Sequence, residues 1–204
     1  MADERRKFEV ALVTPDGSVF EGEAELALII GKRASNVKAA DYKQYIFGYT
    51  CFIDGSARGL PPPGNVFFQM KSRDTFCPLG PWIVTADEIA DPQKLGIELK
   101  NNGTTMQKFN TDDMAHQIPR VIEWLSSIHP LEPGDVVATG TNHRGLHSFM
   151  DGDKVELTIE KVGTLTFNVK DELKRTWART TRSQHKDKGG EGPHTPQTGG
   201  KYAK

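Results

Sequence analysis

An acidic, alternating stretch near the start of the chain limits the folds open to it: EGEAELALIIGK, residues 21–32. It places Glu21, Glu23 and Glu25 at every other position and then runs into the apolar residues Leu26 to Ile30. Side chains alternate between the two faces of a β-strand, so the three carboxylates share one face with a spacing of about 7 Å. The apolar run that follows indicates a strand that enters a core. The sequence therefore predicts a core strand with an acidic face.

Two interpretations of this acidic face are open. The first is an exposed strand face that carries solvated glutamates, which is the common situation for this residue type. The second is a cation site, because Asp54 ends another apolar strand, YTCFID. Acids delivered by two core strands would leave a costly buried charge unless an ion neutralised them. No Cys or His lies at zinc-like spacing near these acids, so an all-oxygen site for Mg²⁺, Mn²⁺ or Ca²⁺ is favoured over zinc.

Composition narrows the class of protein. The chain has 204 residues and a formal net charge of −1, which indicates neither a nucleic-acid surface nor an acidic tail. The first residues lack an apolar signal core, and the longest apolar run is too short to cross a bilayer. Cys51 and Cys77 form no CxxC motif, which suits a reducing compartment. We expect a cytoplasmic protein that binds no nucleic acid and no membrane.

The pattern of strands and turns predicts a β-rich α+β fold. FEVALVT and SVFEG flank PDG, which predicts a short hairpin within residues 1–19. The Gly- and Pro-rich residues 55–68 predict a loop. One catalytic domain is expected over residues 1–180, and the polar residues 181–204 are expected to form a flexible tail.

Further elements are expected in the second half of the chain. Hairpins are predicted at 96–110, turning at NNG, and at 151–169. An amphipathic helix is predicted over 112–128, with Thr111 as its N-cap and an interruption at Pro119. The stretch EPGDVVATGT predicts a turn followed by a buried strand.

Four polar residues outside the acidic stretch are candidates for chemistry. Arg58 and Lys71 are either ordinary solvated cations or groups that hold the carboxylate and enolate oxygens of a substrate at the metal. Thr141, in the strand-terminal loop ATGTNHRG, offers a hydroxyl donor. His143 in the same loop is either a catalytic proton shuttle or an ordinary loop residue.

Five blocks of the sequence together resemble the fumarylacetoacetate hydrolase family. They are EAELALIIGKRASNV, FGYTCFIDGSARG, MKSRDTFCPLGPWIVTADEI, NTDDM and LEPGDVVATGT. The resemblance implies a mixed β-sheet roll with a few peripheral helices, usually homodimeric, and a divalent cation, Mg²⁺ first and otherwise Mn²⁺ or Ca²⁺. It also implies a small 2-oxo or β-dicarbonyl acid as substrate. Members of the family hydrolyse C–C bonds, decarboxylate oxo acids or isomerise hydroxydienedioates.

The resemblance assigns roles to individual residues. The metal ligands of the family fall on Glu23, Glu25 and Asp54, whereas Glu21 matches no ligand and is interpreted as an accessory acid. The substrate-binding arginine and threonine of the family fall on Arg58 and Thr141. Its catalytic lysine, near the metal and the developing oxyanion, falls on Lys71.

This chain departs from the family pattern in two places. The family usually continues SAR with D-x-Q, whereas Gly59, Leu60 and Pro61 stand here, so the substrate end of the pocket should differ. Relatives also carry a His and a Glu under a mobile lid, upstream of the Glu-x-Glu strand. The 22 residues before Glu23 contain no histidine, so we expect this segment to be absent or supplied by another chain.

The expected reaction is C–C bond hydrolysis of the fumarylacetoacetate or acylpyruvate type. Oxo-acid decarboxylation and hydroxydienedioate isomerisation are alternatives, because all three reactions pass through an enolate that a metal stabilises. An alternative of another class is a catalytically silent metal-binding homologue, or one subunit of a larger assembly.

Overall fold

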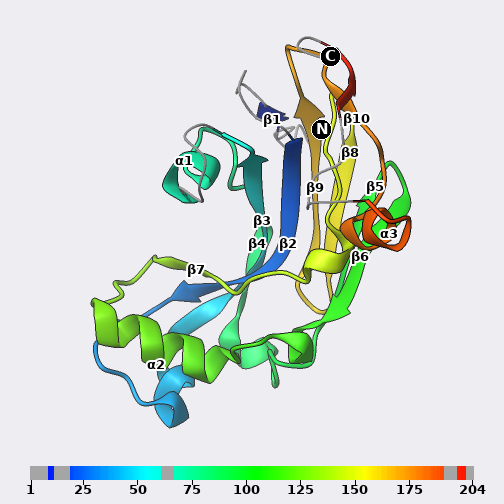
Figure 1. Ribbon diagram of the computed structural model, residues 1–204. Helices are drawn as coiled ribbons and strands as arrows, with labels where there is room; N and C mark the ends of the chain where they lie inside the picture. The colour runs from blue at the N-terminus through cyan, green and yellow to red at the C-terminus, as the bar shows by residue number, and fades with distance from the viewer. Residues whose placement is uncertain (1–8, 12–18, 61–66, 191–196, 201–204) are drawn as a thin grey trace, which may run out of the picture.

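The computed structural model describes residues 9–11, 19–60, 67–190 and 197–200, which form two main sheets (Figure 1). One sheet has the order β1 (Glu9–Ala11), β9 (Gly163–Lys170), β8 (Lys154–Ile159), β5 (Gly96–Asn101), β6 (Thr104–Asn110). The other has the order β4 (Leu79–Thr85), β3 (Ile46–Arg58), β2 (Val19–Ile30), β7 (Val136–Ala138). A smaller pair joins β10 (Thr176–Trp177) to β11 (Gln197–Gly199).

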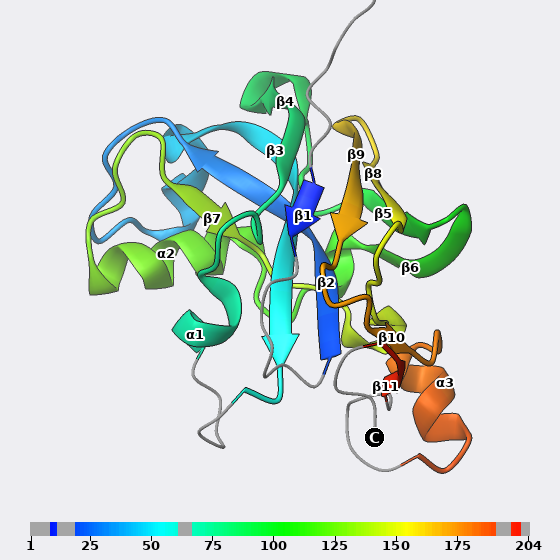
Figure 2. The same ribbon diagram turned by 90° about the horizontal axis from the view of Figure 1, so that it is seen from above.

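The helices are short and lie at the periphery (Figures 1 and 2). They are α1 (Phe67–Lys71), α2 (Ile118–Ile128) and α3 (Arg182–Asp187), with 3-10 turns η1 (Ala39–Tyr45), η2 (Ala86–Glu88), η3 (Thr111–Asp113) and η4 (His143–Gly145). β1 runs parallel to β9, and the other strand pairs are antiparallel, so the five-stranded sheet is mixed and the four-stranded sheet is antiparallel. The predicted β-rich α+β class is therefore confirmed.

The antiparallel pair of β2 and β3 crosses the middle of the molecule (Figure 1). Apolar side chains lie on one face of β2 and acidic side chains on the other. The even-numbered residues Phe20, Ala24, Leu26, Leu28 and Ile30 of β2 belong to the main hydrophobic core. The odd-numbered positions carry the three glutamates, as the period of two predicted. One face of β2 therefore anchors the core, and the opposite face presents the acids.

Two glycines let an aromatic ring and a neighbouring backbone segment approach this strand pair closely. Gly22 of β2 lies opposite Gly55 of β3 in the register. A Cβ atom at Gly22 would overlap the buried ring of Phe149, and one at Gly55 would lie 2.7 Å from the carbonyl oxygen of Phe76. A position without a side chain is required at both places because backbone and rings approach so closely.

Three expectations for the strands were wrong. β1 lies beside β9 in the five-stranded sheet, so it forms no hairpin with β2, and the PDG turn lies outside the described residues. β3 continues through Arg58, so the loop expected at 55–68 starts at Gly59. β7 is not a buried strand, because Val136 is 43% exposed and only Val137 is buried.

The helix expected at 112–128 begins later than predicted. α2 starts at Ile118, and Pro119 lies in its first turn, where the missing N–H costs nothing because it would have no partner there. Pro119 therefore starts the helix rather than interrupting it. Thr111 begins η3 instead of capping α2.

The hairpin at 96–110 is confirmed. β5 and β6 pair antiparallel, and its turn residues Asn102 and Gly103 both have positive φ angles, 50° and 81°. An Asn-Gly pair adopts this conformation at low cost, which is why NNG predicted the turn.

The segment after residue 180 contains regular structure, against the expectation of a flexible tail. Thr181 and Gln184 form a capping box that starts α3, and β11 pairs with β10. A flexible tail was predicted from the polar composition alone. That prediction was wrong because the residues that hold this segment lie far away in the sequence. Among the described residues, none of the helices has the length and apolar character needed to cross a membrane.

We expect Gly22→Ala to lower the free energy of unfolding by about 1–3 kcal/mol, because the new methyl group must displace the ring of Phe149. Urea unfolding measures the change. Gly96→Ala is the matched control, because the nearest heavy atom to its new Cβ atom is Glu160 Oε2 at 3.7 Å. Equal stability losses for the two variants would contradict this packing argument.

Candidate metal centre

Three carboxylates converge on one face of the β2–β3 pair. The register places Glu23 directly opposite Asp54, and Glu25 follows two residues later on the same face. One oxygen from each of these residues lies within 4.8 Å of the others. The structure therefore brings together the three acids that the sequence predicted as metal ligands.

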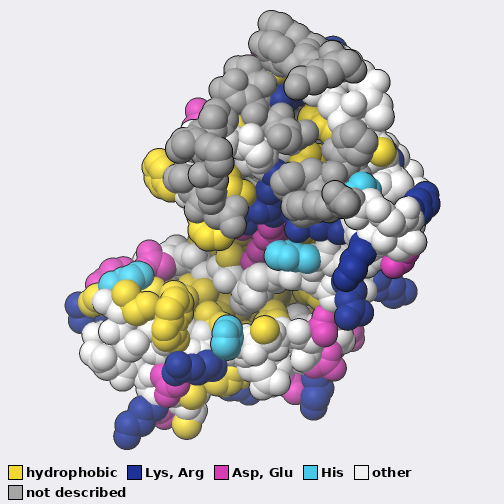
Figure 3. Space-filling view, in the orientation of Figure 1, with side chains coloured by type: hydrophobic (Ala, Val, Ile, Leu, Met, Phe, Trp, Pro, Cys, Tyr) yellow, Lys and Arg dark blue, Asp and Glu magenta, His cyan; other side chains and the backbone are white. Residues whose placement is uncertain are grey.

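Two cations, one at the end of β3 and one at the end of α1, contact this cluster. Lys71, the last residue of α1, places Nζ 2.5 Å from Asp54 Oδ2 and 3.1 Å from Glu23 Oε2. Arg58, at the end of β3, donates from its terminal nitrogen to Glu23 Oε1 and from Nε to Glu21 Oε2 at 3.2 Å. Figure 3 shows acidic and basic side chains gathered in a hollow in the middle of this face.

A third cation reaches Glu21 from the other end of the chain. Arg182 of α3 donates from Nε to Glu21 Oε1 at 3.2 Å and from its terminal nitrogen to Glu21 Oε2 at 2.5 Å. Glu21 is only 2% exposed, so this two-point contact neutralises a buried carboxylate. The accessory acid predicted from the sequence is thus the residue that connects the C-terminal part of the chain to the centre.

Glu25 forms none of these ion pairs. Its carboxylate is 2% exposed and accepts a hydrogen bond from the Gly140 backbone N–H at 2.7 Å. Within the described residues, the ion pairs supply Glu21, Glu23 and Asp54 with Arg58, Lys71 and Arg182, three acids with three cations. An ionised Glu25 would therefore be a buried negative charge without a cation beside it.

The ionisation of the acids reflects this imbalance. Burial raises the pKa of Glu25 to about 8, and the charges of Asp54 and Glu23 act in the same direction. Burial also raises the pKa of Asp54, although Lys71 opposes it. Burial acts to raise the pKa of Glu23 as well, but Lys71 and Arg58 outweigh it and leave that pKa below its usual value. The proton affinity of the cluster is thus concentrated at Glu25.

The donor set fits a hard divalent cation. Three carboxylate oxygens are ligands of the kind that Mg²⁺, Mn²⁺ and Ca²⁺ prefer. Two ligand oxygens on opposite sides of an ion lie about 4.2 Å apart for Mg²⁺ and about 4.8 Å apart for Ca²⁺. The three carboxylate oxygens lie within 4.8 Å of one another, so a single ion of this size could contact all three. A cation here would also stabilise the ionised form of Glu25, so the three acids form a candidate metal centre.

The loop after β7 lies against the acidic strand. Thr139 donates its hydroxyl to the Leu26 carbonyl oxygen at 2.7 Å, and Gly140 follows with its bond to Glu25. Gln107 of β6 fastens the loop from the other side, because its amide nitrogen donates to Thr141 Oγ1 and to the Asn142 carbonyl oxygen, both at 3.0 Å. Its amide oxygen accepts from the Ala24 N–H at 3.3 Å, so one side chain joins the loop to β2.

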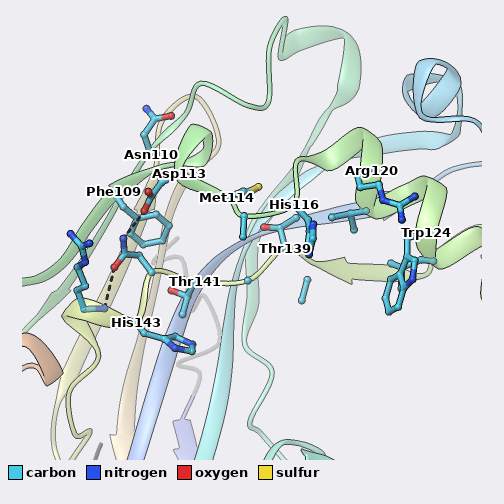
Figure 4. Close-up of a pocket in the computed structure, with 17 residues that line it drawn as sticks. Phe109, Asn110, Asp113, Met114, His116, Arg120, Trp124, Thr139, Thr141 and His143 are labelled. Atoms are coloured by element: carbon cyan, nitrogen blue, oxygen red, sulfur yellow. Dashed lines mark hydrogen bonds between the residues drawn. The ribbon is translucent and has the colours of Figure 1, made fainter.

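A cavity of about 730 Å³ opens beside this loop. Figure 4 shows Thr141 and His143 on the loop side, with His116 and Trp124 on the side of α2. The acids of the cluster do not line the cavity, but Gly140, which binds Glu25, does. The cavity is lined by Phe109, Asn110, Asp113, Met114, Ala115, His116, Arg120, Val121, Trp124, Leu125, Ala138, Thr139, Gly140, Thr141, Asn142, His143 and Arg144.

The candidate residues from the sequence thus fall into two groups. Arg58 and Lys71 contact the acid cluster directly, whereas Thr141 and His143 line the neighbouring cavity. His143 is exposed at the start of η4.

Sequence reasoning missed Gln107 and Arg182. Gln107 is an ordinary polar residue of an expected strand in the sequence, and only the structure shows that its amide is buried. Arg182 gives none, because its partner is 161 residues away.

The chain is similar to a known protein family and to characterised proteins. The model of the fumarylacetoacetate (FAA) hydrolase C-terminal domain matches residues 8–170. Oxaloacetate tautomerase YisK of Bacillus subtilis is 39% identical over 155 residues, which are 73% of this chain and 52% of the relative. This chain thus spans about half the length of the curated relatives that it matches.

Solved structures also superpose on this chain. 5-Carboxymethyl-2-hydroxymuconate delta-isomerase from Mycobacterium smegmatis superposes with a TM-score of 0.74 at 38% identity, covering 81% of this chain and 63% of that chain. Maleylpyruvate hydrolase from a Sphingobium species, in complex with manganese (II) ion and pyruvate, superposes with a TM-score of 0.73 at 38% identity. That alignment covers 81% of this chain and 60% of the hydrolase.

We expect the metal-free protein to lose stability as the pH rises from about 4.5 to about 8. The folded state binds the Glu25 proton more tightly than the unfolded state, so this stabilisation is complete below the unfolded pKa and disappears as the pH passes about 8. The loss attributable to Glu25 is at most about 5 kcal/mol. Glu25→Gln should remove it, because an uncharged amide cannot ionise.

Urea unfolding in EDTA between pH 5 and pH 9 measures this effect as the difference between wild type and Glu25→Gln. Glu172→Gln, at an exposed position, is the control. A difference that stays constant across this range would contradict the assignment. Added Mg²⁺ or Mn²⁺ should restore wild-type stability at high pH, since an ion that binds only the native state stabilises it.

Proposed function

Because this chain belongs to the fumarylacetoacetate hydrolase family, we propose that it is a divalent-metal-dependent enzyme that enolises a small 2-oxo acid. The observation that carries the proposal is the cluster of Glu23, Glu25 and Asp54 with the cations Lys71 and Arg58 at its edge. A Mg²⁺ or Mn²⁺ ion held by the three acids would supply a Lewis acid that draws electrons from the 2-oxo group of the substrate.

Arg58 is proposed to bind the carboxylate of the substrate. Its guanidinium is held between Glu21 and Glu23, with a side chain 12% exposed, so it is oriented before a substrate arrives. A planar guanidinium makes two parallel hydrogen bonds to a carboxylate, which fixes the position of the acid as well as its charge.

Lys71 is proposed to stabilise the negative charge that develops on the 2-oxo oxygen. Its ammonium already lies within hydrogen-bond distance of Asp54 and Glu23, at the edge of the candidate metal centre. A fixed cation at this position interacts more strongly with the transition state than with the neutral ketone, which is the condition for catalysis.

The cavity beside the loop is proposed to receive the remainder of the substrate. Its apolar walls, with Met114, Val121, Trp124 and Leu125, suit an acyl or alkenyl tail, while Thr141 lies on the side nearest Glu25. At about 730 Å³ it lies within the range typical of small-molecule sites. The proposed substrates are therefore 2-oxo acids that carry a further carbon chain.

Keto–enol tautomerisation is the reaction that this set of residues supports best. It moves one proton from carbon 3 to the 2-oxo oxygen and requires no activated water. The similarity to an oxaloacetate tautomerase at 39% identity supports it. C–C bond hydrolysis, the reaction first expected from the sequence, is the second candidate, and the similarity to a maleylpyruvate hydrolase at 39% identity favours it.

The homodimer expected from the family resemblance remains a prediction. Sedimentation equilibrium in the presence of Mg²⁺ would measure the oligomeric state.

We expect metal-dependent conversion of 2-oxo acids by the wild type. The test incubates oxaloacetate, acylpyruvates and hydroxydienedioates with Mg²⁺ or Mn²⁺. A tautomer keeps the mass of the substrate and is followed by enol absorbance, whereas hydrolysis adds water and yields two acids, and decarboxylation releases CO₂. EDTA and Glu23→Ala should each abolish turnover, and Glu172→Gln should not.

Failure to convert any of these acids, together with tight Mn²⁺ binding, would support the alternative of a silent metal-binding homologue. Absence of both turnover and Mn²⁺ binding by calorimetry would contradict the proposed function altogether.

We further expect His143→Ala to lower kcat by about 10²-fold, because His143 stands beside Thr141 at the cavity and is the proposed proton carrier. The pH dependence of kcat should lose one limb in this variant. His129→Ala is the control, because His129 lies at the end of α2 outside the cavity lining. Unchanged kcat and an unchanged pH profile would exclude the role of His143.

A further inference from the structure

The C-terminal segment, residues 176–190, lies against the loop that precedes β8. The Arg182 backbone N–H donates to the Leu146 carbonyl oxygen at 2.9 Å, and Ser148 Oγ donates to the Ala178 carbonyl oxygen at 3.4 Å. Ser148 in turn forms an isolated β-bridge with Glu21. The segment is therefore docked next to the acidic end of β2. It lies beyond residue 170, where the match to the family model ends.

A continuous chain of charge pairs runs from this segment to the metal centre. Arg182 contacts both oxygens of Glu21, and Glu21 Oε2 also accepts from Arg58 Nε. Arg58 then donates to Glu23, one of the three candidate ligands. Four side chains from β2, β3 and α3 are thereby linked through direct contacts.

We propose that Arg182 is a positioning residue that controls the orientation of Arg58 through Glu21. Arg182 supplies the buried Glu21 carboxylate with its own cation. Arg58 then makes a single contact to Glu21, from its Nε. Its terminal nitrogens are directed to Glu23 and to the carboxylate of an incoming substrate. The role of Arg58 toward the substrate rests on the proposed function, whereas the linkage of the ion pairs does not.

The geometry explains why an arginine is needed at position 182. Its planar group makes contacts to both Glu21 oxygens, Nε to Oε1 and the terminal nitrogen to Oε2, which orients the carboxylate as well as neutralising it. Glu21 is 2% exposed, so loss of Arg182 would leave a buried carboxylate with Arg58 as the partner in reach. We expect Arg58 to turn toward Glu21 and away from the substrate position.

Removal of Arg182 should have opposite effects on the affinity for metal and the affinity for substrate. This pair of effects distinguishes a positioning role from a general loosening of the fold. The centre becomes more negative by one charge, so Arg182→Gln should bind Mn²⁺ about 3- to 10-fold more tightly. The same variant should raise KM for the oxo acid about 10-fold with little change in kcat, because the Arg58 contact to the carboxylate is weakened. A variant that only loosens the fold would bind both metal and substrate less tightly.

Calorimetry with Mn²⁺ alone and steady-state kinetics measure these two effects. Arg182→Lys keeps the charge, so it should return the Mn²⁺ affinity to the wild-type value while KM stays raised. Lys186→Gln removes a cation from an exposed position of the same helix and is the matched control. It should leave Mn²⁺ affinity and KM unchanged.

A double-mutant cycle tests whether Arg182 acts through Glu21. In the background of Glu21→Gln, the further change Arg182→Gln should shift KM by less than twofold, because the path from Arg182 to Arg58 is already broken. Additive shifts in KM would overturn the proposal, as would wild-type Mn²⁺ affinity and KM in Arg182→Gln.

The wild type binding no Mn²⁺ or converting no oxo acid would count against the proposed function. A spectroscopic measurement on the metal-free protein still tests the role of Arg182 in that case. In ¹H–¹⁵N spectra, Arg182→Gln should shift the Nε–H signal of Arg58, since both groups bind Glu21. Lys186→Gln should leave that signal in place. An unchanged Arg58 signal in Arg182→Gln would overturn the linkage even in an active enzyme.

Discussion

The pairing of β2 with β3 is the constraint on which the rest of the structure depends. Its register brings Glu23 opposite Asp54 on one face, while the even-numbered residues of β2 enter the hydrophobic core on the other. A shift of one residue would send three glutamates into that core, so burial of the apolar face also fixes where the acids lie. Gly22 and Gly55 reinforce the register, because Phe149 and Phe76 pack directly against them.

Burial of the acids then determines which partners the remainder of the chain must supply. Arg58 arrives on β3 itself, Lys71 on α1 and Arg182 on α3, and together they neutralise Glu21, Glu23 and Asp54. Buried carboxylates are tolerated only when they are paired, so each of these contacts ties a separate segment to the centre. Glu25 is left with one backbone hydrogen bond and a pKa of about 8, which makes it the place where a divalent cation would be most stabilising.

The site therefore has a charged part and a mostly apolar part that meet at the loop after β7. Gly140 binds Glu25, while Thr141 and His143 line the cavity, so the loop is where a bound acid and its tail would join. Gln107 holds this loop to β2 and β6 through both ends of its amide. Solved structures named as an isomerase and as a hydrolase share this fold, since one fold can host several reactions.

Local patterns in the sequence determined the acidic strand, the hairpin at Asn102 and Gly103, and the β-rich class, because alternation and turn chemistry act between neighbouring residues. The sequence also made Asp54, Arg58 and Lys71 candidates, to which the family resemblance assigned roles, and the structure brings all three to the cluster. The tertiary structure alone decided the parallel place of β1, the start of α2 at Ile118 and the docking of α3. Arg182 shows the physical reason: its partner Glu21 is 161 residues away, and a charge pair over that separation leaves no periodic trace in the sequence.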